Sequence, residues 1–532
     1  MSAVRLLAIA VGCVFPAFAQ GGLPAPLAPP QNPTTPARAV LGKLLFWDEQ
    51  LSSSGRVACG TCHRPEAGGG DPRRARHPGP DGLLMTPDDR FGSPGIERRD
   101  ASGSYQPHPA FGFGTQVTGR AAPALHMAPY FQKIAWDGGS GSALADPVSG
   151  TLVIPTGAAL ESQALRAFAS TVEMGREGRT WAEIVQRVQQ VRPLALARDL
   201  PPDVASALAA SPTYPQLFLV AFGDAAISPS RIAMALAAYQ RTTVPGATPW
   251  DAFMNGDPLA MTANQVAGWD VFRNAGQCSG CHTPGLFTDQ RFRGLGLVPV
   301  ADDPGRAGIT GRSADGGLFK VPSLRNVGLK STFMHNGRFS NLTQVIGFYR
   351  NGGGTSGPRD PSLQTLSLDP VTTAALLDFV GNALVDPRAR NRLPPFDRPT
   401  LLSENEPVGG NEYGMPTAAN GVAPRLLAAV PAYLGNGEFV VGAFDLPTAS
   451  HWLALAGQPA PPGSVQAGVS LAVDPAAALW LPMVTGAGNS ASMAMSVPVA
   501  APLRGPLLFG QVFSALPAGS WAATRGASLP IR

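Results

Sequence analysis

The sequence predicts a mainly α-helical protein of two related domains with long loops, followed by a C-terminal all-β domain of the sandwich type. Three observations lead to this fold class. A Cys-x-x-Cys-His pattern occurs twice, 219 residues apart; helix signals flank the second copy; and the end of the chain alternates short apolar runs with turn signals. The 532 residues suffice for two or three domains, and 62 Gly, 54 Pro and 14% charged residues indicate long ordered loops.

The first residues have the pattern of a secretory signal peptide. Arg5 precedes an apolar stretch from Leu6 to Phe15, and Ala17-Phe18-Ala19 is a cleavage site of the A-x-A type. The stretch is too short to span a bilayer, and no later segment is long and apolar enough. We therefore expect removal of residues 1–19 and a periplasmic or secreted protein with no membrane span. A lipoprotein processed at Cys13 is an alternative, although the usual Leu is missing.

The other four cysteines all lie in the repeated pattern. Its copies are Cys59-Gly60-Thr61-Cys62-His63 and Cys278-Ser279-Gly280-Cys281-His282. Thioethers at positions i and i+3 fasten a porphyrin, and the adjacent His supplies an imidazole to its iron. The pattern therefore predicts two covalently attached haem c groups, held by Cys59, Cys62, Cys278 and Cys281, with His63 and His282 on the metal.

Other uses of these cysteines fit the pattern less well. A zinc site built from two Cys-x-x-Cys pairs does not need a His after each pair. A thioredoxin-like pair follows a strand in a βαβ unit and would not occur twice with His. Structural disulfides suit an exported protein, but adjacent Cys-x-x-Cys pairs are unusual for that purpose.

Helix signals place each haem in a helical domain of its own. Thr262 can cap a helix that leads into the second motif, and Ser228-Pro229 opens a helix over residues 231–241. A further helix begins at Pro370 and has an apolar face. We expect an N-terminal cytochrome c-type haem domain over residues 37–245 and a C-terminal one over residues 246–390. The net charge of +4 is spread without a Lys/Arg run, which argues against a nucleic-acid partner.

Several ordered blocks around the motifs resemble the bacterial dihaem cytochrome c peroxidase and MauG family. The resemblance runs from about Ala37 to Arg388. It includes Leu41-Gly42-Lys43-Leu44-Leu45-Phe46-Trp47-Asp48, Gly119-Arg120-Ala121-Ala122-Pro123, Ala135-Trp136-Asp137-Gly138, Leu160-Glu161-Ser162-Gln163-Ala164, Val172-Glu173-Met174-Gly175 and Phe333-Met334-His335-Asn336-Gly337.

The resemblance implies a division of labour between the haems. The N-terminal haem would react with hydrogen peroxide, and Gln163 and Glu173 match the family's distal pair. A carboxylate can shuttle the proton that O–O cleavage requires, and an amide can orient the peroxide. Trp136 matches the Trp between the haems. The alternatives are a solvated charge for Glu173, a surface amide for Gln163 and core packing for Trp136.

The resemblance also bears on the second axial ligand of the C-terminal haem. Fourteen residues after His335, conventional peroxidases of the family carry Met, whereas MauG-like proteins carry Tyr; this chain has Tyr349. A thioether raises the haem potential, while a phenolate stabilises Fe(III) and higher states. The alternative is that Tyr349 is a core aromatic residue and that Met334 or another Met is the ligand.

The sequence departs from the family pattern at two places. The position of a displaceable His near the first haem falls on Phe113, so we expect an open, five-coordinate iron unless His108 or His77 reaches it. The family binds calcium partly through an Asn in the Gly-Arg-Asn-x-Pro block, where this chain has Ala121. Backbone carbonyls near Lys330 and Thr332 could still contribute, so calcium stays open.

The C-terminal part has a different composition. After a Pro/Gly/Asn-rich linker (residues 391–424), residues 425–532 contain only seven charged residues. Apolar runs at residues 439–444, 465–473, 493–499 and 507–513 alternate with turn signals, which predicts a β-sandwich accessory domain.

The leading functional prediction is an exported dihaem peroxidase-class oxidoreductase of the MauG-like branch. It would react with hydrogen peroxide at the N-terminal haem and exchange electrons through the C-terminal haem with a small c-type cytochrome or another redox protein. One alternative is a conventional cytochrome c peroxidase that removes peroxide with electrons from a small cytochrome. The other is a non-enzymatic dihaem electron-transfer or sensing protein.

Overall fold

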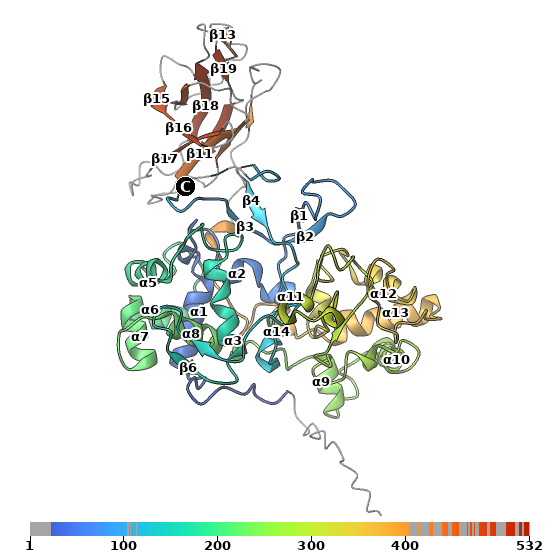
Figure 1. Ribbon diagram of the computed structural model, residues 1–532. Helices are drawn as coiled ribbons and strands as arrows, with labels where there is room; N and C mark the ends of the chain where they lie inside the picture. Colours follow the sequence, from blue (N-terminus) through green and yellow to red (C-terminus); the bar gives the residue numbers. More distant parts are fainter. Residues whose placement is uncertain are drawn as a thin grey trace, which may run out of the picture.

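The computed structural model of the chain describes residues 23–103, 106, 108–112 and 114–404. Beyond these it describes strands from β9 (Glu412–Tyr413) to β20 (Gly526–Pro530) and a few neighbouring residues. Helices with long connecting loops form one part, and the strands after residue 404 lie apart from them (Figure 1). The predicted signal peptide, Cys13 and Phe113 lie outside the described residues. No helix in the described ranges has the length and apolar character that crossing a membrane requires.

The first helical unit (residues 36–242) is organised by one helix crossing. Helix α1 (Pro36–Trp47) begins after Thr35, whose side chain accepts from the Arg38 amide, and it packs against α8 (Pro229–Thr242). Gly42 permits the contact, because a Cβ there would lie 1.9 Å from the Ala235 carbonyl oxygen.

The second helical unit (residues 249–390) contains an equivalent crossing. Helix α10 (Ala263–Arg273) packs against α13 (Pro370–Asp378). A Cβ at Gly268 would lie 2.0 Å from the Ala375 carbonyl oxygen. In both crossings a glycine meets the backbone of an alanine, and the aromatic residue four positions after that alanine, Tyr239 or Phe379, packs beside it. The two units therefore share one packing solution.

The predicted helix starts are confirmed. Thr262 accepts from the Gln265 amide at the start of α10, and Ser228 accepts from the Arg231 amide at the start of α8. The other helices of the first unit are α2 (Cys59–Cys62), α3 (Ala159–Ala164), α4 (Arg166–Ala169), α5 (Trp181–Gln190), α6 (Pro202–Ala210) and α7 (Tyr214–Phe222). Those of the second are α9 (Pro249–Met254), α11 (Ala307–Thr310), α12 (Leu342–Arg350) and α14 (Pro387–Arg390).

Single-turn elements and short hairpins complete the two units. The turns are η1 (Glu49–Leu51), η2 (Pro65–Ala67), η3 (Ala128–Tyr130), η4 (Cys278–Gly280), η5 (Ser313–Asp315), η6 (Val327–Leu329), the π-turn η7 (Phe379–Ala383) and η8 (Leu402–Glu404). The antiparallel hairpins pair β1 (Ala75–His77) with β2 (Arg90–Gly92), β3 (Pro94–Glu97) with β4 (Thr115–Val117), β5 (Leu144–Ala145) with β6 (Leu152–Ile154), and β7 (Phe292–Arg293) with β8 (Phe319–Lys320).

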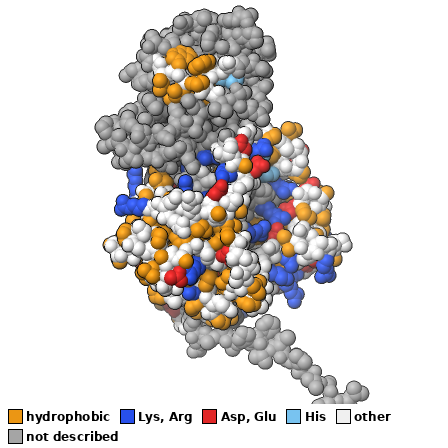
Figure 2. All heavy atoms as spheres, turned by 60° about the vertical axis from the view of Figure 1, so that its left-hand side comes forward, with side chains coloured by type: hydrophobic (Ala, Val, Ile, Leu, Met, Phe, Trp, Pro, Cys, Tyr) orange, Lys and Arg blue, Asp and Glu red, His pale blue; other side chains and the backbone are white. Residues whose placement is uncertain are grey.

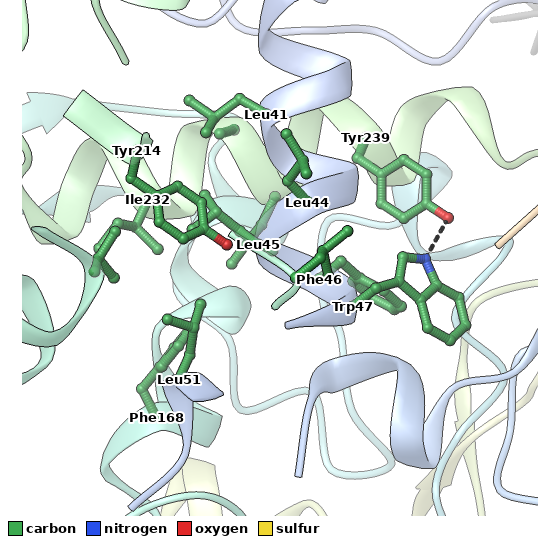
Figure 3. Packing of buried hydrophobic residues seen from close by; sticks show 14 of the residues in the cluster. Leu41, Leu44, Leu45, Phe46, Trp47, Leu51, Phe168, Tyr214, Ile232 and Tyr239 are labelled. Carbon is green, nitrogen blue, oxygen red and sulfur yellow. Dashed lines mark hydrogen bonds between the residues drawn. The ribbon is translucent and has the colours of Figure 1, made fainter. Parts of the chain in front are cut away.

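Each unit has its own hydrophobic core. The first core joins α1, α7 and α8, and in it the Trp47 indole N–H donates to the Tyr239 hydroxyl over 3.0 Å (Figure 3). In the second core, aromatic rings pack against one another mostly edge-on: Trp250, Trp269, Phe272, Phe287 and Phe379. Aromatic pairs of this kind add stability beyond their buried area.

The segment after the second unit returns to the first one. The Arg398 guanidinium pairs with the carboxylates of Glu66 and Glu404, and the Glu49 carboxylate accepts from the Leu402 amide over 2.8 Å. Arg398 also lies over the Trp47 ring, 5.3 Å from its centroid. The first part of the predicted linker, residues 391–404, is thus anchored on the first unit.

The strands after residue 404 form two antiparallel sheets and a small hairpin. One sheet has the order β10 (Arg425–Ala428), β11 (Phe439–Phe444), β17 (Ser490–Met495), β16 (Val484–Gly486). The other has the order β15 (Leu479–Pro482), β12 (Ser450–Ala456), β18 (Leu507–Ala515), β20, β9, with β19 (Trp521–Ala523) also on β18. Strands β13 (Val465–Gln466) and β14 (Val469–Ser470) form the hairpin. Face-to-face packing as a sandwich stays a prediction.

Candidate functional site

The first Cys-x-x-Cys-His motif is fixed by the core beneath it. Helix α2 lies against the Trp47 indole, so closely that a Cβ at Gly60 would be 2.1 Å from Cε3 of that ring. The Thr61 hydroxyl accepts from the Ala58 amide over 2.9 Å and closes the turn. The sequence Gly-Thr between the cysteines therefore serves the placement of the motif.

His63 is oriented by one backbone contact. Its Nδ1 lies 2.9 Å from the Gly69 carbonyl oxygen, which can only accept, so Nδ1 carries the proton and Nε2 keeps its lone pair. Burial lowers the pKa of His63, which favours the neutral imidazole. A neutral ring with a free Nε2 is the form that ligates iron, and an Nδ1–H to carbonyl contact is the usual support for such a ligand.

The second motif repeats this arrangement. His282 Nδ1 lies 3.1 Å from the Phe287 carbonyl oxygen, so this ring too presents Nε2, and burial lowers its pKa. The four described cysteines form no disulfide. Within the described ranges, no three His, Cys, Asp or Glu side chains gather as a zinc site would require. Paired free sulfurs at i and i+3, followed by a neutral imidazole, fit a haem c at each motif.

The glycines of the two motifs give a matched test of this packing. We expect Gly60→Ala to destabilise the holoprotein by about 1–3 kcal/mol, because the added methyl group overpacks against Trp47. We expect Gly280→Ala to stay within about 0.5 kcal/mol, because a Cβ there meets nothing within 4 Å. Guanidinium unfolding of both variants measures the difference. Equal stability would contradict the placement of α2 on the indole.

Of the two predicted distal residues, Glu173 acts electrostatically on the first motif. Burial, with a contribution from Glu173, raises the pKa of Cys59 to about 12, and the charge of Glu173 also acts on Cys62. The pKa of Glu173 itself is raised, chiefly by burial, although Ser170 and Arg166 oppose the shift. A solvated helix charge would show no such desolvation, so the structure does not favour that alternative.

Gln163 belongs to α3 and precedes Glu173 by ten residues in the sequence. Its Oε1 is buried and makes no hydrogen bond to any described residue. A buried amide oxygen without a partner is costly, and such atoms concentrate where a ligand completes the site. This state differs from that of a surface amide, which water would satisfy.

Trp136 lies where the two helical units meet. Its indole N–H donates to the Ala121 carbonyl over 2.8 Å, and its own carbonyl accepts from the Lys320 amide in β8. Its ring lies 6.4 Å from that of His335, which stacks on Phe319 with centroids 3.5 Å apart. Trp136 is thus bonded to both units.

Tyr349 lies in α12 beside the second motif. Burial raises its pKa above the usual range, and the charges of Cys281 and Cys278 act in the same direction. Its ring packs edge-on against Phe348, 5.5 Å between centroids. The phenol therefore shares the surroundings of both cysteines, although this placement alone does not make it a ligand.

His77 and His108, the two histidines that the sequence offered as further ligands of the first iron, lie together. His108 and His77 both contact the Phe111 ring, and each Nδ1 accepts a nearby backbone amide, from Ala110 and Gly79 respectively. Neighbouring charges from Arg98 act on His108, and those from Arg90 act on His77. The five-coordinate first iron stays a prediction.

The sequence analysis missed one residue at the first motif. The Arg73 guanidinium lies 3.3 Å from the Cys62 sulfur, donates to the Pro94 carbonyl and pairs with Asp71 at 2.8 Å. In the holoprotein that sulfur would be a thioether. No motif signals this role, because the Asp-x-Arg spacing occurs widely in turns.

Comparison with known proteins agrees with the geometry. The family model "Di-haem cytochrome c peroxidase" matches residues 36–258. The methylamine utilization protein MauG of Methylorubrum extorquens is 30% identical over 328 residues, 61% of this chain and 72% of that protein. A cytochrome c peroxidase of Denitromonas iodatirespirans is 28% identical over 392 residues, 68% of this chain and 85% of that protein.

A more distant relative carries a peroxidase name as well. The cytochrome c551 peroxidase of Nitrosomonas europaea is 24% identical over 349 residues, 64% of this chain and 82% of that protein. These relatives are oxidoreductases of one di-haem family, and the two motifs with their oriented imidazoles meet its cofactor requirement. The chain belongs to the di-haem cytochrome c peroxidase and MauG family.

Proposed function

We propose that the protein is an exported dihaem oxidoreductase of the MauG-like branch, which reacts with hydrogen peroxide at the haem of His63 and exchanges electrons through the haem of His282. Two features support this proposal. The Glu173 carboxyl acts electrostatically on the first cysteine pair, and its segment packs on Gly95, next to the Pro94 carbonyl that Arg73 links to the Cys62 sulfur. The charges of the second cysteine pair act on the Tyr349 phenol. Each group suits a different task at its iron.

At the first site the residues manage protons. A haem held there by Cys59, Cys62 and His63 would supply the electrons that break the O–O bond. Glu173 accepts the proton from the near oxygen of the peroxide and delivers it to the far one. Gln163 accepts a hydrogen bond from the peroxide with its unpaired Oε1 and fixes its orientation. Burial raises the pKa of Glu173, so its carboxyl binds a proton more readily than a solvated glutamate, which suits a group that both takes and gives one.

Between the sites, Trp136 provides a polarizable contact. The bond from its indole N–H to the Ala121 carbonyl orients the ring, and the bond that its backbone carbonyl accepts from the Lys320 amide ties the residue to the second unit. A fixed aromatic ring at this place would support electron exchange between the haems.

At the second site we propose that Tyr349, together with His282, would hold the haem iron. A phenolate is a hard anionic oxygen and stabilises the ferric state. This second haem would then share oxidising equivalents with the first and would resist reduction. A conventional cytochrome c peroxidase is the second candidate, since two of the three relatives reported above carry that name.

We also propose the domain organisation that the sequence predicts. The haem domains comprise residues 37–245 and 246–390, a linker comprises residues 391–424, and a β-sandwich accessory domain comprises residues 425–532.

Export by the N-terminal signal would bring the protein to the periplasm or outside the cell, where haem c proteins meet redox partners. The electron partner would be a small c-type cytochrome or another redox protein. The surface drawn in Figure 2 mixes acidic and basic side chains on the helical units.

The test is the reaction of the fully ferric protein with one equivalent of hydrogen peroxide. We expect the optical bands of both haems to change without prior reduction, because both irons supply electrons. A reaction that begins only after one haem is reduced would select the conventional peroxidase. No response in either state would refute the peroxidase proposal.

A further inference from the structure

The chain that follows the first haem motif contacts the second helical unit, and this contact forms a junction between the two units. The loop Gly68–Gly70 follows His63 and packs on the turn η6 and the residue after it, Lys330. A Cβ at Gly68 would lie 2.5 Å from the Asn326 carbonyl oxygen and 3.0 Å from Lys330 Cγ. Lys330 therefore lies flat against the loop whose Gly69 carbonyl orients His63.

The ammonium of Lys330 reaches the end of this loop. A Cβ at Gly70 would lie 2.5 Å from Lys330 Nζ and 3.5 Å from the Ala122 carbonyl oxygen, so both atoms face one point. Ala122 belongs to the Gly-Arg-Ala-Ala-Pro block of the first unit. One lysine from the second unit thus contacts the loop Gly68–Gly70 beside the first haem motif, and its ammonium points to the same place as the Ala122 carbonyl.

The surroundings do not fit a calcium ion. Calcium takes six to eight oxygen ligands from carboxylates, carbonyls and water, so backbone carbonyls near Lys330 and Thr332 would need side-chain oxygens beside them. Ala121 offers no side-chain oxygen, and Asp71 is already held by Arg73. Among the described residues nearby, Thr332 contributes a single buried hydroxyl without a partner. A divalent cation would also meet the like charge of Lys330 at short range.

The charge of Lys330 acts on the residues around the first iron ligand. Lys330 is among the groups that lower the pKa values of His63 and of the buried His126, while Asp71 attracts the ammonium. Burial lowers the pKa of Lys330 to about 8, so the ammonium remains protonated at neutral pH. Lys330 is only partly exposed, and a bound haem would bring propionate carboxylates, anions that can balance such a cation.

We propose that the Lys330 ammonium supplies the positive charge at the junction of the two units and takes the place of a bound calcium ion. The junction is then charged by the chain itself, and the first haem depends on no metal cofactor other than iron. This proposal rests on the haem assignment and does not depend on the reaction with peroxide.

The first experiment uses the wild-type holoprotein and measures the midpoint potential of the His63 haem by spectroelectrochemistry, with CaCl2 and with EGTA. We expect the same potential in both and less than one calcium per chain by elemental analysis. Release of about one calcium per chain by EGTA, together with a shifted potential, would overturn the proposal.

The second experiment compares Lys330→Met with Lys133→Met, which removes the same charge from an exposed side chain. We expect Lys330→Met to shift the potential of the His63 haem to more negative values, because loss of a nearby positive charge favours Fe(III). Lys133→Met should have the potential of wild type. Lys330→Arg keeps the positive charge and should have a potential close to that of wild type. Identical potentials for the two methionine variants would contradict the proposal. A protein inert to peroxide would refute the function above but leave both measurements valid.

Discussion

Glu173→Gln should lower the rate constant for the reaction of the ferric protein with hydrogen peroxide by about 10²–10⁴-fold. The amide has nearly the shape of the carboxyl and keeps the packing, but it cannot carry a proton from one peroxide oxygen to the other. Stopped-flow absorbance under excess peroxide measures the rate constant, and a pyridine haemochrome assay verifies that both haems remain attached.

The pH profile separates proton transfer from a loss of structure. Burial raises the pKa of Glu173, so the carboxylate forms only at a pH above the usual glutamate range. The wild-type rate constant should therefore rise with pH across this shifted range, whereas the profile of Glu173→Gln should be flat there. Glu177→Gln makes the same chemical change on an exposed residue nearby and should behave as wild type. Wild-type kinetics in Glu173→Gln would remove the carboxyl from the mechanism.

Much of the helical fold could be predicted because its signals are local. A Thr or Ser that caps a helix acts on amides three residues away, so Thr262 and Ser228 could be identified from the sequence. The apolar run at residues 439–444 coincides with β11 for the same reason. The haem attachment residues follow from spacing within five positions.

Features that depend on distant contacts could not be predicted. The helix expected from Pro370 stops at Asp378 and continues as the π-turn η7, where the Gly381 backbone meets Gly328 so closely that a Cβ on Gly328 would lie 1.9 Å from its oxygen. The hydrophobic periodicity of one helix does not indicate that Gly328 packs against it. The approach of Lys330 to Gly70 joins residues in different units in the same way.

The resemblance to a known family added information that the local sequence pattern does not contain. Nothing in the local pattern distinguishes Glu173 from a surface carboxylate or Trp136 from a core residue. The structure supports the functional reading through burial of Glu173 and through the bonds of Trp136 to both units. Their roles in the reaction stay predictions.

We expect a low-spin EPR signal from the second haem of the isolated ferric protein, and Tyr349→Phe should abolish it. Phenylalanine fills the same space beside Phe348, so packing is retained and only the phenol oxygen is lost. If that oxygen is the axial ligand, the iron loses one coordination position and becomes high-spin or binds water. Low-temperature EPR of the variant beside wild type measures the change.

Two further variants decide between a ligand and a core aromatic residue. Tyr130→Phe removes a phenol of η3 in the first unit, which donates to the Pro24 carbonyl, and should leave the signal intact. Tyr349→Met offers a thioether, which raises the haem potential and should produce a second haem that is easily reduced. With that haem reducible, the variant should need an electron before it reacts with peroxide, as a conventional peroxidase does. An unchanged spectrum in both Tyr349 variants would assign the residue to the core, because neither the loss of the oxygen nor the arrival of sulfur would then reach the iron.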